Sequence, residues 1–222
     1  MMRRHGSPDA ANGGPKDFDA VAAAWDANPV RVKLARDVVR AIRDTIPMTP
    51  DTTVLDFGCG TGLLGLGLLP IVKSVTGVDS SQGMLDVLNE KIREQGYRCM
   101  TTFRADLVQG DTLPGRYDLV ASSMAFHHIR DTGPLLETLY RALLPGGRIA
   151  IADLDCDEGR FHESPEGVFH NGFDRCILKG MLERAGFTNV RNRTAAIVRK
   201  PAPGGDIRTF TVFLMTGQKP ED

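Results

Sequence analysis

Apolar residues along this chain form short continuous runs that alternate with runs of helical spacing. The continuous runs predict buried strands at 53–57, 74–78, 99–104, 117–122 and 148–152. Helical spacing predicts helices at 63–72, 82–95, 133–144 and 173–185, the first ended or distorted by Pro70. Strands that alternate with helices favour a parallel sheet with helices on both of its faces.

The regions on either side of this alternation differ from it. Upstream, Phe18 to Trp25 has helical spacing, Asn28-Pro29 breaks it, and a second helix follows with apolar residues from Val30 to Ile42. Downstream, strand-like runs at 190–198 and 209–215 are joined by a predicted turn at Gly204-Gly205, which favours an antiparallel pair. A further turn is expected at Pro145-Gly146-Gly147.

Composition and charge limit the class of protein. Hydrophobic residues make up 41% and charged residues 25% of 222 residues, which fits one α/β domain at 17–222 behind a polar, flexible tail at 1–16. The net charge of -1 disfavours nucleic acid as a partner. No apolar run approaches the roughly 20 residues of a membrane span, and no signal-like segment is present, so we expect a cytoplasmic protein.

A glycine-rich loop follows the first strand of the alternation. Asp56-Phe57-Gly58-Cys59-Gly60-Thr61-Gly62 runs from a buried strand into a helix, and glycine lets a backbone turn tightly and approach a ligand. A dinucleotide fingerprint would need a small residue at position 63, where this chain has Leu63, and the GK[ST] ending of a P-loop is absent. The loop therefore favours a ligand without a pyrophosphate.

Acidic residues follow the next two strands. Asp79 ends the second strand, where a carboxylate can accept hydrogen bonds from both hydroxyls of a ribose. Asp106 and Leu107 follow the third strand and suit an adenine ring, and Met84 suits the other face of that ring. Each residue alone is equally explained as a helix cap, loop acid or core side chain; their position after successive strands favours a nucleoside site.

These runs resemble a known family. VLDFGCGTG, VTGVDSS followed by QGMLDVL, FRADL, YDLV and LLPGGRIAIAD are similar to class I S-adenosylmethionine-dependent methyltransferases, closest to the small-molecule group that includes ubiquinone and menaquinone biosynthesis enzymes. The resemblance covers roughly Thr53 to Asp153. It implies a Rossmann-like seven-stranded sheet, mostly parallel with an antiparallel last strand, and S-adenosylmethionine as cofactor.

The resemblance also implies a cofactor-binding set. Asp56, Gly58 and Gly60 would line the methionine end, Asp79 would hold the ribose, and Asp106 with Leu107 would hold the adenine. Cys59, Ser80 and Met84 lie within the same matching runs and complete the expected set: Asp56, Gly58, Cys59, Gly60, Asp79, Ser80, Met84, Asp106 and Leu107.

Candidate catalytic residues follow the fourth and fifth strands. His127 or His128 is a candidate base, with a structural role as the alternative, and Asp153 ends the fifth strand. The stretch at 154–172 is longer than most loops and contains His162 and His170, so we interpret it as a substrate loop with His170 as first candidate base. A solvated acidic turn is expected at 153–159, and no metal site is predicted.

The sequence thus predicts methyl transfer from S-adenosylmethionine to a small-molecule acceptor, with the segment at 17–46 as an N-terminal helical lid; a packing helix is the alternative there. Alignment and exclusion of water supply much of the catalysis in such a reaction. Two rival functions remain: a non-catalytic S-adenosylmethionine-binding protein and a nucleotide-dependent oxidoreductase. Nothing in the sequence indicates the acceptor atom or the oligomeric state.

Overall fold

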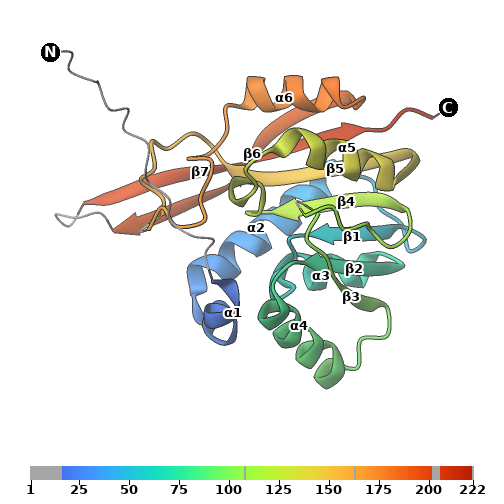
Figure 1. The fold of residues 1–222 in the computed structure, drawn as a ribbon, viewed down its shortest axis with the longest axis horizontal. Coiled ribbons are helices and arrows are strands. Elements are labelled where there is room, and N and C mark those ends of the chain that lie inside the picture. The colour runs from blue at the N-terminus through green and yellow to red at the C-terminus, as the bar shows by residue number, and fades with distance from the viewer. Residues whose placement is uncertain (1–16, 108, 163, 202–205, 222) are drawn as a thin grey trace, which may run out of the picture.

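The structure, a computed structural model, describes residues 17–107, 109–162, 164–201 and 206–221, and its centre is one seven-stranded sheet (Figure 1). The strand order is β3-β2-β1-β4-β5-β7-β6, with β7 antiparallel to both of its neighbours and the other neighbouring pairs parallel. The strands are β1 Thr53–Phe57, β2 Ser74–Asp79, β3 Met100–Arg104, β4 Tyr117–Ser123, β5 Leu143–Leu154, β6 Thr188–Pro201 and β7 Ile207–Gln218. The predicted mostly parallel sheet with an antiparallel last strand is confirmed.

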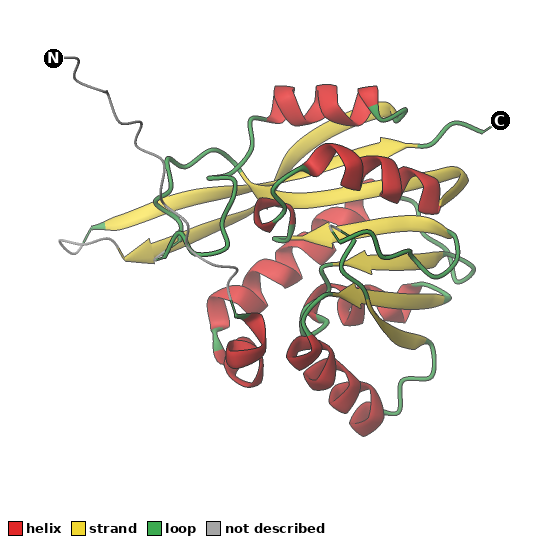
Figure 2. Cartoon of the chain, in the orientation of Figure 1, coloured by secondary structure: helices red, strands yellow, loops and turns green. Residues whose placement is uncertain are grey.

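Helices cover both faces of the sheet (Figure 2). The α-helices are α1 Phe18–Val21, α2 Pro29–Thr45, α3 Leu63–Leu68, α4 Gln82–Gln95, α5 Thr132–Ala142 and α6 Arg175–Arg184, and the 3-10 helices are η1 Ala22–Ala27, η2 Leu69–Ile71 and η3 Phe126–His128. None of the helices in the described part of the chain is long and apolar enough to cross a membrane.

Alternation along β1 explains the two cores. Val54 points to the layer formed with α2, α3 and α4, whereas its neighbour Leu55 points to the layer formed with α5 and α6. Both side chains are fully buried. A strand buried on both faces has a nearly continuous apolar sequence, which is why this one was predictable.

Local capping fixes where the helices begin. The side chain of Asn28 accepts hydrogen bonds from Val30 N and Arg31 N, and Pro29 is the first residue of α2, so the predicted break is a helix start. Ser81 and Asp174 cap α4 and α6 in the same way. Such caps contribute about 1 kcal/mol each.

The first helix after β1 ends at Leu68 and is followed by a 3-10 turn that contains Pro70, so the predicted end or distortion at Pro70 is confirmed. Other predicted boundaries are wrong. The expected turn at 145–147 lies inside β5 as a bulge, because β5 pairs with β4 on both sides of it. The helix expected at 173–185 starts at Arg175. The tail at 1–16 and the turn at Gly204-Gly205 lie outside the described residues.

The hairpin of β6 and β7 extends beyond the rest of the sheet (Figure 1). Pairing between β5 and β7 ends at Leu154 with Val212, whereas β6 and β7 stay paired as far as Pro201 with Ile207. We call residues 197–201 and 207–211 the hairpin arm. The arm brings residues far along the chain next to the loop that follows β5.

Candidate active site

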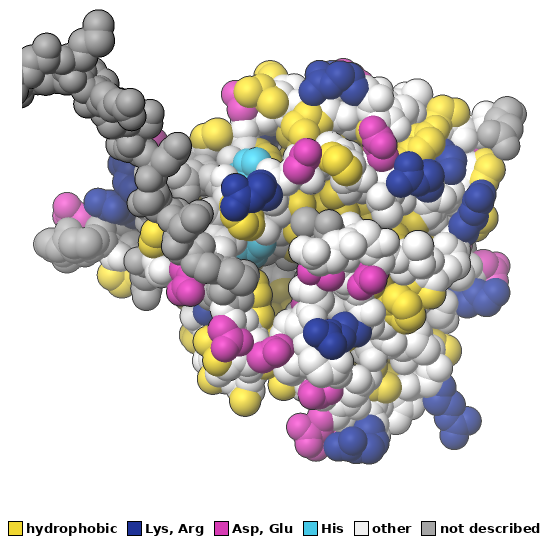
Figure 3. Space-filling model, viewed as in Figure 1, with side chains coloured by type: hydrophobic (Ala, Val, Ile, Leu, Met, Phe, Trp, Pro, Cys, Tyr) yellow, Lys and Arg dark blue, Asp and Glu magenta, His cyan; other side chains and the backbone are white. Residues whose placement is uncertain are grey.

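A cavity of about 1100 Å³ lies at the edge of the sheet where the parallel strands end. Its wall is formed by the glycine loop, the residues after β2, β3 and β4, the N-terminal segment, residues 159–162, 164 and 166, and the hairpin arm. Open α/β sheets bind ligands at this edge because the strand ends and helix starts leave a crevice there. Figure 3 shows histidine side chains at the surface of the face on which α1 and α4 lie.

The backbone of the glycine loop requires glycine. Gly58, Gly60 and Gly62 have φ angles of 67°, 52° and 85°, which other residues rarely adopt. A Cβ on Gly58 would lie 2.4 Å from the Cβ of Ala125, whereas a Cβ on Gly60 would meet only Met84 Sδ at 3.9 Å. The glycine loop therefore packs closely against Ala125, which follows β4, and leaves open space at Gly60.

Asp56 lies behind this loop rather than on the cavity wall. Its Oδ2 accepts a hydrogen bond from Gly65 N at 2.9 Å, and its Oδ1 is buried with no hydrogen-bond partner among the described residues. Burial raises the pKa of this carboxyl to about 7, against the opposing effect of the Gly65 hydrogen bond. Asp56 thus connects β1 to α3 through this hydrogen bond.

Asp79 lies on the cavity wall at the end of β2. Its Oδ2 accepts from Gly60 N at 2.8 Å and its Oδ1 from Ser81 N at 2.9 Å, while burial raises its pKa. Ser80 and Met84 also line the cavity, and Met84 is almost completely buried. The carboxylate is thus fixed between the glycine loop and the start of α4.

The residues after β3 also line the cavity, as expected. Asp106 and Leu107 are both on the wall, and Asp106 Oδ1 accepts a hydrogen bond from Gln109 N at 3.3 Å. Cys59 lines the wall with a thiol whose pKa is raised by burial and then by Asp56, so it stays protonated and poorly nucleophilic.

A buried histidine–carboxylate pair lies at the same cavity. His127 Nδ1 is 2.7 Å from Asp153 Oδ1, and both side chains are essentially inaccessible to solvent. Asp153 Oδ1 also accepts from Leu154 N, and its Oδ2 accepts from His127 N. The expected solvated turn at 153–159 is therefore wrong for its first residue, because Asp153 lies within β5 facing His127.

Two more histidines surround His127. The ring of His128 lies 4.1 Å from that of His127 between centroids, and the ring of His162 lies 4.8 Å from it. Burial, followed by the effect of His127, lowers the pKa of His128 to about 3, so His128 is neutral and its Nδ1 can donate to Gly167 O at 2.6 Å. His127, His128 and His162 all line the cavity.

His170 has a different environment. Its Nε2 lies 2.9 Å from Ile129 O, its ring packs on Phe173, and it is not part of the cavity wall. The backbone N–H groups of Phe169 and His170 both donate to His127 O, which ties the loop to η3. The structure therefore does not place His170, the first candidate base, at the cavity, whereas His162 of the same loop lines it.

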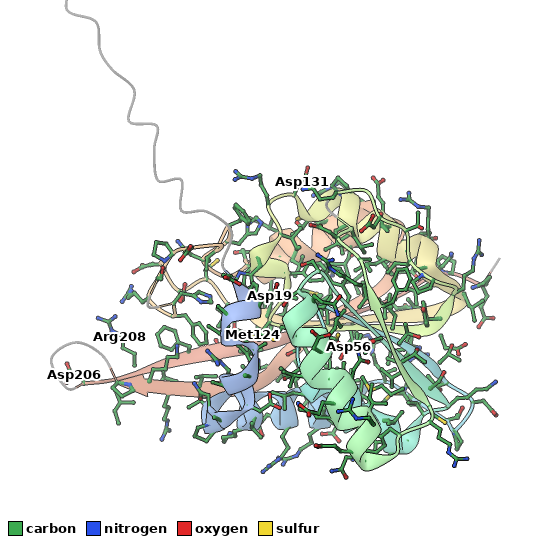
Figure 4. The ribbon with its side chains drawn as sticks, turned by 60° about the horizontal axis from the view of Figure 1, so that its bottom comes forward. Asp19, Asp56, Met124, Asp131, Asp206 and Arg208 are labelled. Atoms are coloured by element: carbon green, nitrogen blue, oxygen red, sulfur yellow. The ribbon has the colours of Figure 1, made fainter. Side chains whose placement is uncertain are left out.

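The N-terminal segment contacts the glycine loop and the start of α4 through two aspartates that sequence reasoning missed. Asp26 accepts from Thr61 Oγ1 at 2.6 Å and pairs with Lys91 of α4. Asp19 accepts from Ser81 Oγ at 2.5 Å and Gly83 N at 2.8 Å, and Figure 4 shows Asp19 on the segment beside α4. No spacing in the sequence marks these residues, because their partners lie 35 to 65 positions away.

The same segment contributes to the cavity wall. Phe18, Trp25 and Arg31 line it, and Phe18 contacts the ring of His128. By contrast, α2 carries a row of fully or nearly fully buried apolar residues that packs against α3 and β6. Within the segment at 17–46, the part before α2 and the first turns of α2 therefore contribute to the cavity wall, whereas the rest of α2 packs into the core.

Known proteins share this fold and these motifs. A family model described as a methyltransferase domain matches residues 54–147. An uncharacterized methyltransferase of Geobacillus kaustophilus is 32% identical over 152 residues, which are 67% of this chain and 68% of the relative. The chain belongs to the S-adenosylmethionine-dependent methyltransferase family.

Other family members differ in length from this chain. An uncharacterized methyltransferase of Schizosaccharomyces pombe is 36% identical over 143 residues, 61% of this chain and 48% of the relative. A ubiquinone biosynthesis O-methyltransferase of a Caulobacter strain is 31% identical over 157 residues, 62% of this chain and 61% of the relative. This methyltransferase chain thus spans about half to three fifths of the length of these relatives.

Solved structures agree with the fold. A putative methyltransferase in complex with the Haloferax volcanii Trm112 activator has a TM-score of 0.74 at 21% identity, covering 92% of this chain and 98% of that one. A Haemonchus contortus phosphoethanolamine N-methyltransferase in complex with S-adenosylmethionine has a TM-score of 0.67 at 18% identity, covering 93% and 61%. At these identities the likeness concerns the fold.

The methyltransferase cofactor fits the residues on the cavity wall. The backbone is open at Gly60, a carboxylate stands at the end of β2, and Met84 and Leu107 provide apolar surfaces near Asp106. The buried Oδ1 of Asp56, directly behind the loop, has no partner of its own in the described structure. A cationic ligand at this acidic part of the wall is favoured by Coulomb attraction.

Proposed function

We propose that this methyltransferase transfers the methyl group of S-adenosylmethionine to a small-molecule acceptor that loses a proton to His127. The observation that carries the proposal is the buried His127–Asp153 pair, in which His127 lines the same cavity as the glycine loop and Asp79. Asp79 would accept hydrogen bonds from the ribose, and Asp106 with Leu107 would contact the adenine.

The pair is arranged for proton transfer. A carboxylate at Nδ1 holds the imidazole in one orientation and leaves Nε2 to take a proton. S-adenosylmethionine would supply a methyl group bound to a positively charged sulfonium sulfur. Loss of this methyl group would leave S-adenosylhomocysteine, whose sulfur is neutral. The proton from an acceptor O–H or N–H would pass to His127 Nε2, and the Asp153 carboxylate would stabilise the resulting imidazolium.

The surrounding residues would orient the acceptor and exclude water. Phe18, Trp25 and Phe161 line the cavity from the N-terminal segment and the loop after β5. Enclosing the reactants in this way aligns the nucleophile with the methyl carbon, and alignment supplies a large share of the acceleration in such reactions.

A turnover assay with isotopically labelled S-adenosylmethionine and an extract of small metabolites tests this function. We expect labelled small molecules with the wild type, and His127→Gln should lower the rate by about 10²-fold while cofactor affinity changes less than about threefold. Asp153 is a positioning residue, so Asp153→Asn should lower kcat while KM for the acceptor changes little.

The comparison with His170 makes the test specific. If His170→Gln loses the activity and His127→Gln retains it, the assignment of the base is wrong. A wild type that binds S-adenosylhomocysteine but labels no small molecule would favour a non-catalytic binding protein. Binding of NAD in preference to S-adenosylmethionine would favour an oxidoreductase.

A further inference from the structure

Met124 has a backbone conformation that is unusual for an apolar residue. It follows β4 directly and has a φ angle of 58°, in the left-handed region that most side chains disfavour (Figure 4). Among the described residues, the other positions with positive φ are glycines, apart from Glu158 and Asn189. Glu158 is exposed and paired with Arg160, and Asn tolerates this region. Met124 is therefore the one position in the described chain where such strain coincides with an apolar side chain.

The chain around Met124 fixes this conformation from two sides. Met124 N donates to Ala152 O at 2.8 Å, in the strand next to β4. The following residue, Ala125, packs so closely against the glycine loop that a Cβ on Gly58 would lie 2.4 Å from the Cβ of Ala125. Strained residues persist where the surroundings determine their conformation in this way, and they cluster at functional sites. The strain points to a use of the Met124 side chain that glycine would not supply.

The side chain of Met124 lies on the wall that the cofactor and the acceptor would share. Met124 lines the cavity together with Gly60 of the glycine loop and with His127, three residues further along the chain. Like Phe161, it is partly buried and packs against the core layer formed with α2, α3 and α4. An unbranched thioether adapts its shape to a neighbouring apolar group and is only a weak hydrogen-bond acceptor. Met124 and Phe161 thus give this wall an apolar surface.

We propose that Met124 determines the specificity of the methyl transfer: an apolar edge of the acceptor packs on its side chain while the adjacent O–H or N–H group lies at His127. The side chain selects acceptors with an apolar edge beside the methylated atom over hydrated ones such as sugars. A polar group placed there loses water without gaining a hydrogen bond. This proposal rests on the proposed function and adds the chemical class of the acceptor.

The side-chain test uses two variants of similar size, Met124→Leu and Met124→Gln, in the extract assay with labelled S-adenosylmethionine. Both keep the β-carbon, and therefore the strain, and they differ in polarity. Label in the wild-type products should be at least about tenfold higher with Met124→Leu than with Met124→Gln, because Gln adds an amide that the acceptor must desolvate. Equal label from the two variants would overturn the proposal.

Calorimetry with S-adenosylhomocysteine accompanies this test. The affinity of both variants should stay within about threefold of the wild type, since the proposal assigns Met124 to the acceptor. A larger loss of affinity in a variant that thermal unfolding shows to be folded would assign the side chain to the cofactor site and would overturn the proposal.

The backbone test compares Met124→Gly with Met124→Ala. Both remove the selecting surface, so label in the wild-type products should fall by about tenfold or more in each. Met124→Gly should unfold at a higher urea concentration than Met124→Ala, because glycine adopts a φ of 58° without strain. Wild-type products retained by folded Met124→Gly, or a midpoint for Met124→Ala as high as that of Met124→Gly, would overturn the proposal.

Asn189→Gly is the matched control for relief of strain. Asn189 has a φ of 52° and lies outside the cavity wall. Its replacement should leave the labelled products unchanged. Equal effects of Asn189→Gly and Met124→Gly on the products would contradict a role of the Met124 side chain in selecting the acceptor.

A second readout separates this proposal from the proposed function. Labelled products of the wild type are passed in water at neutral pH over a reversed-phase resin. Retained label supports an acceptor with an apolar edge, and label in the flow-through contradicts it while leaving the methyltransferase function intact. The absence of any labelled product contradicts the proposed function itself and this inference with it.

Discussion

At the scale of single residues, the buried carboxyl of Asp56 has the clearest measurable consequence. Its folded-state pKa of about 7 lies above its ordinary value of 3.8 because burial disfavours the charge. Between these two values the folded protein holds a proton that the unfolded chain has released. The free energy of unfolding must therefore fall as pH rises through this window.

We predict that the wild type loses stability relative to Asp56→Asn between about pH 4 and pH 7. At about 1.4 kcal/mol per pH unit between the two pKa values, the relative loss is roughly 4 kcal/mol. Urea unfolding of both proteins across this range measures it, and titrations that the two share cancel in the difference. A stability difference that stays constant with pH would contradict the raised pKa of Asp56.

At the scale of elements, the N-terminal segment is held to the glycine loop by Asp26 and to the start of α4 by Asp19. The hydrogen bonds from Ser81 Oγ and Gly83 N lower the pKa of Asp19, so it remains a carboxylate at neutral pH. Asp26 connects the hydroxyl of Thr61 to Lys91. The segment therefore contacts both ends of the region where the cofactor is proposed to bind.

We predict that Asp26→Asn speeds release of S-adenosylhomocysteine and raises its Kd several-fold, because the segment then covers the cavity for a smaller fraction of the time. Stopped-flow displacement measures the release rate. Asp37→Asn is the control, since Asp37 forms an ion pair with Lys33 on α2 that involves no residue of the cavity. Equal release rates for Asp26→Asn and the wild type would show that the segment does not retain the cofactor.

The elements themselves were largely predictable, and the exceptions have local causes. Helix α4 matches its predicted bounds because Ser81 caps its start and Gly96 caps its end. Strand β1 matches its predicted bounds because it is a short apolar run. The glycines at 146 and 147 predicted a turn, yet pairing with β4 and β7 makes this stretch part of β5. Pairing between strands that are distant in sequence has no signal in the local amino-acid sequence.

At the scale of the whole molecule, the order of the strands determines the site. The carboxyl ends of β1, β2 and β4 meet at one edge, so Gly60, Asp79 and His127 reach one cavity although they are distant in sequence. This convergence could be predicted from the strand–helix alternation. The contributions of the N-terminal segment and the hairpin arm could not, because they depend on how these two parts of the chain fold back toward that edge.

The central claim is that this cavity binds S-adenosylmethionine through Asp79, and calorimetric titration tests it most directly. We predict micromolar binding of S-adenosylhomocysteine, roughly -8 kcal/mol, and at least tenfold weaker binding by Asp79→Asn. Thermal unfolding of the variant is measured alongside, because Asp79 also accepts hydrogen bonds from Gly60 and Ser81. The absence of binding by folded wild type, or an unchanged Kd in folded Asp79→Asn, would contradict the account.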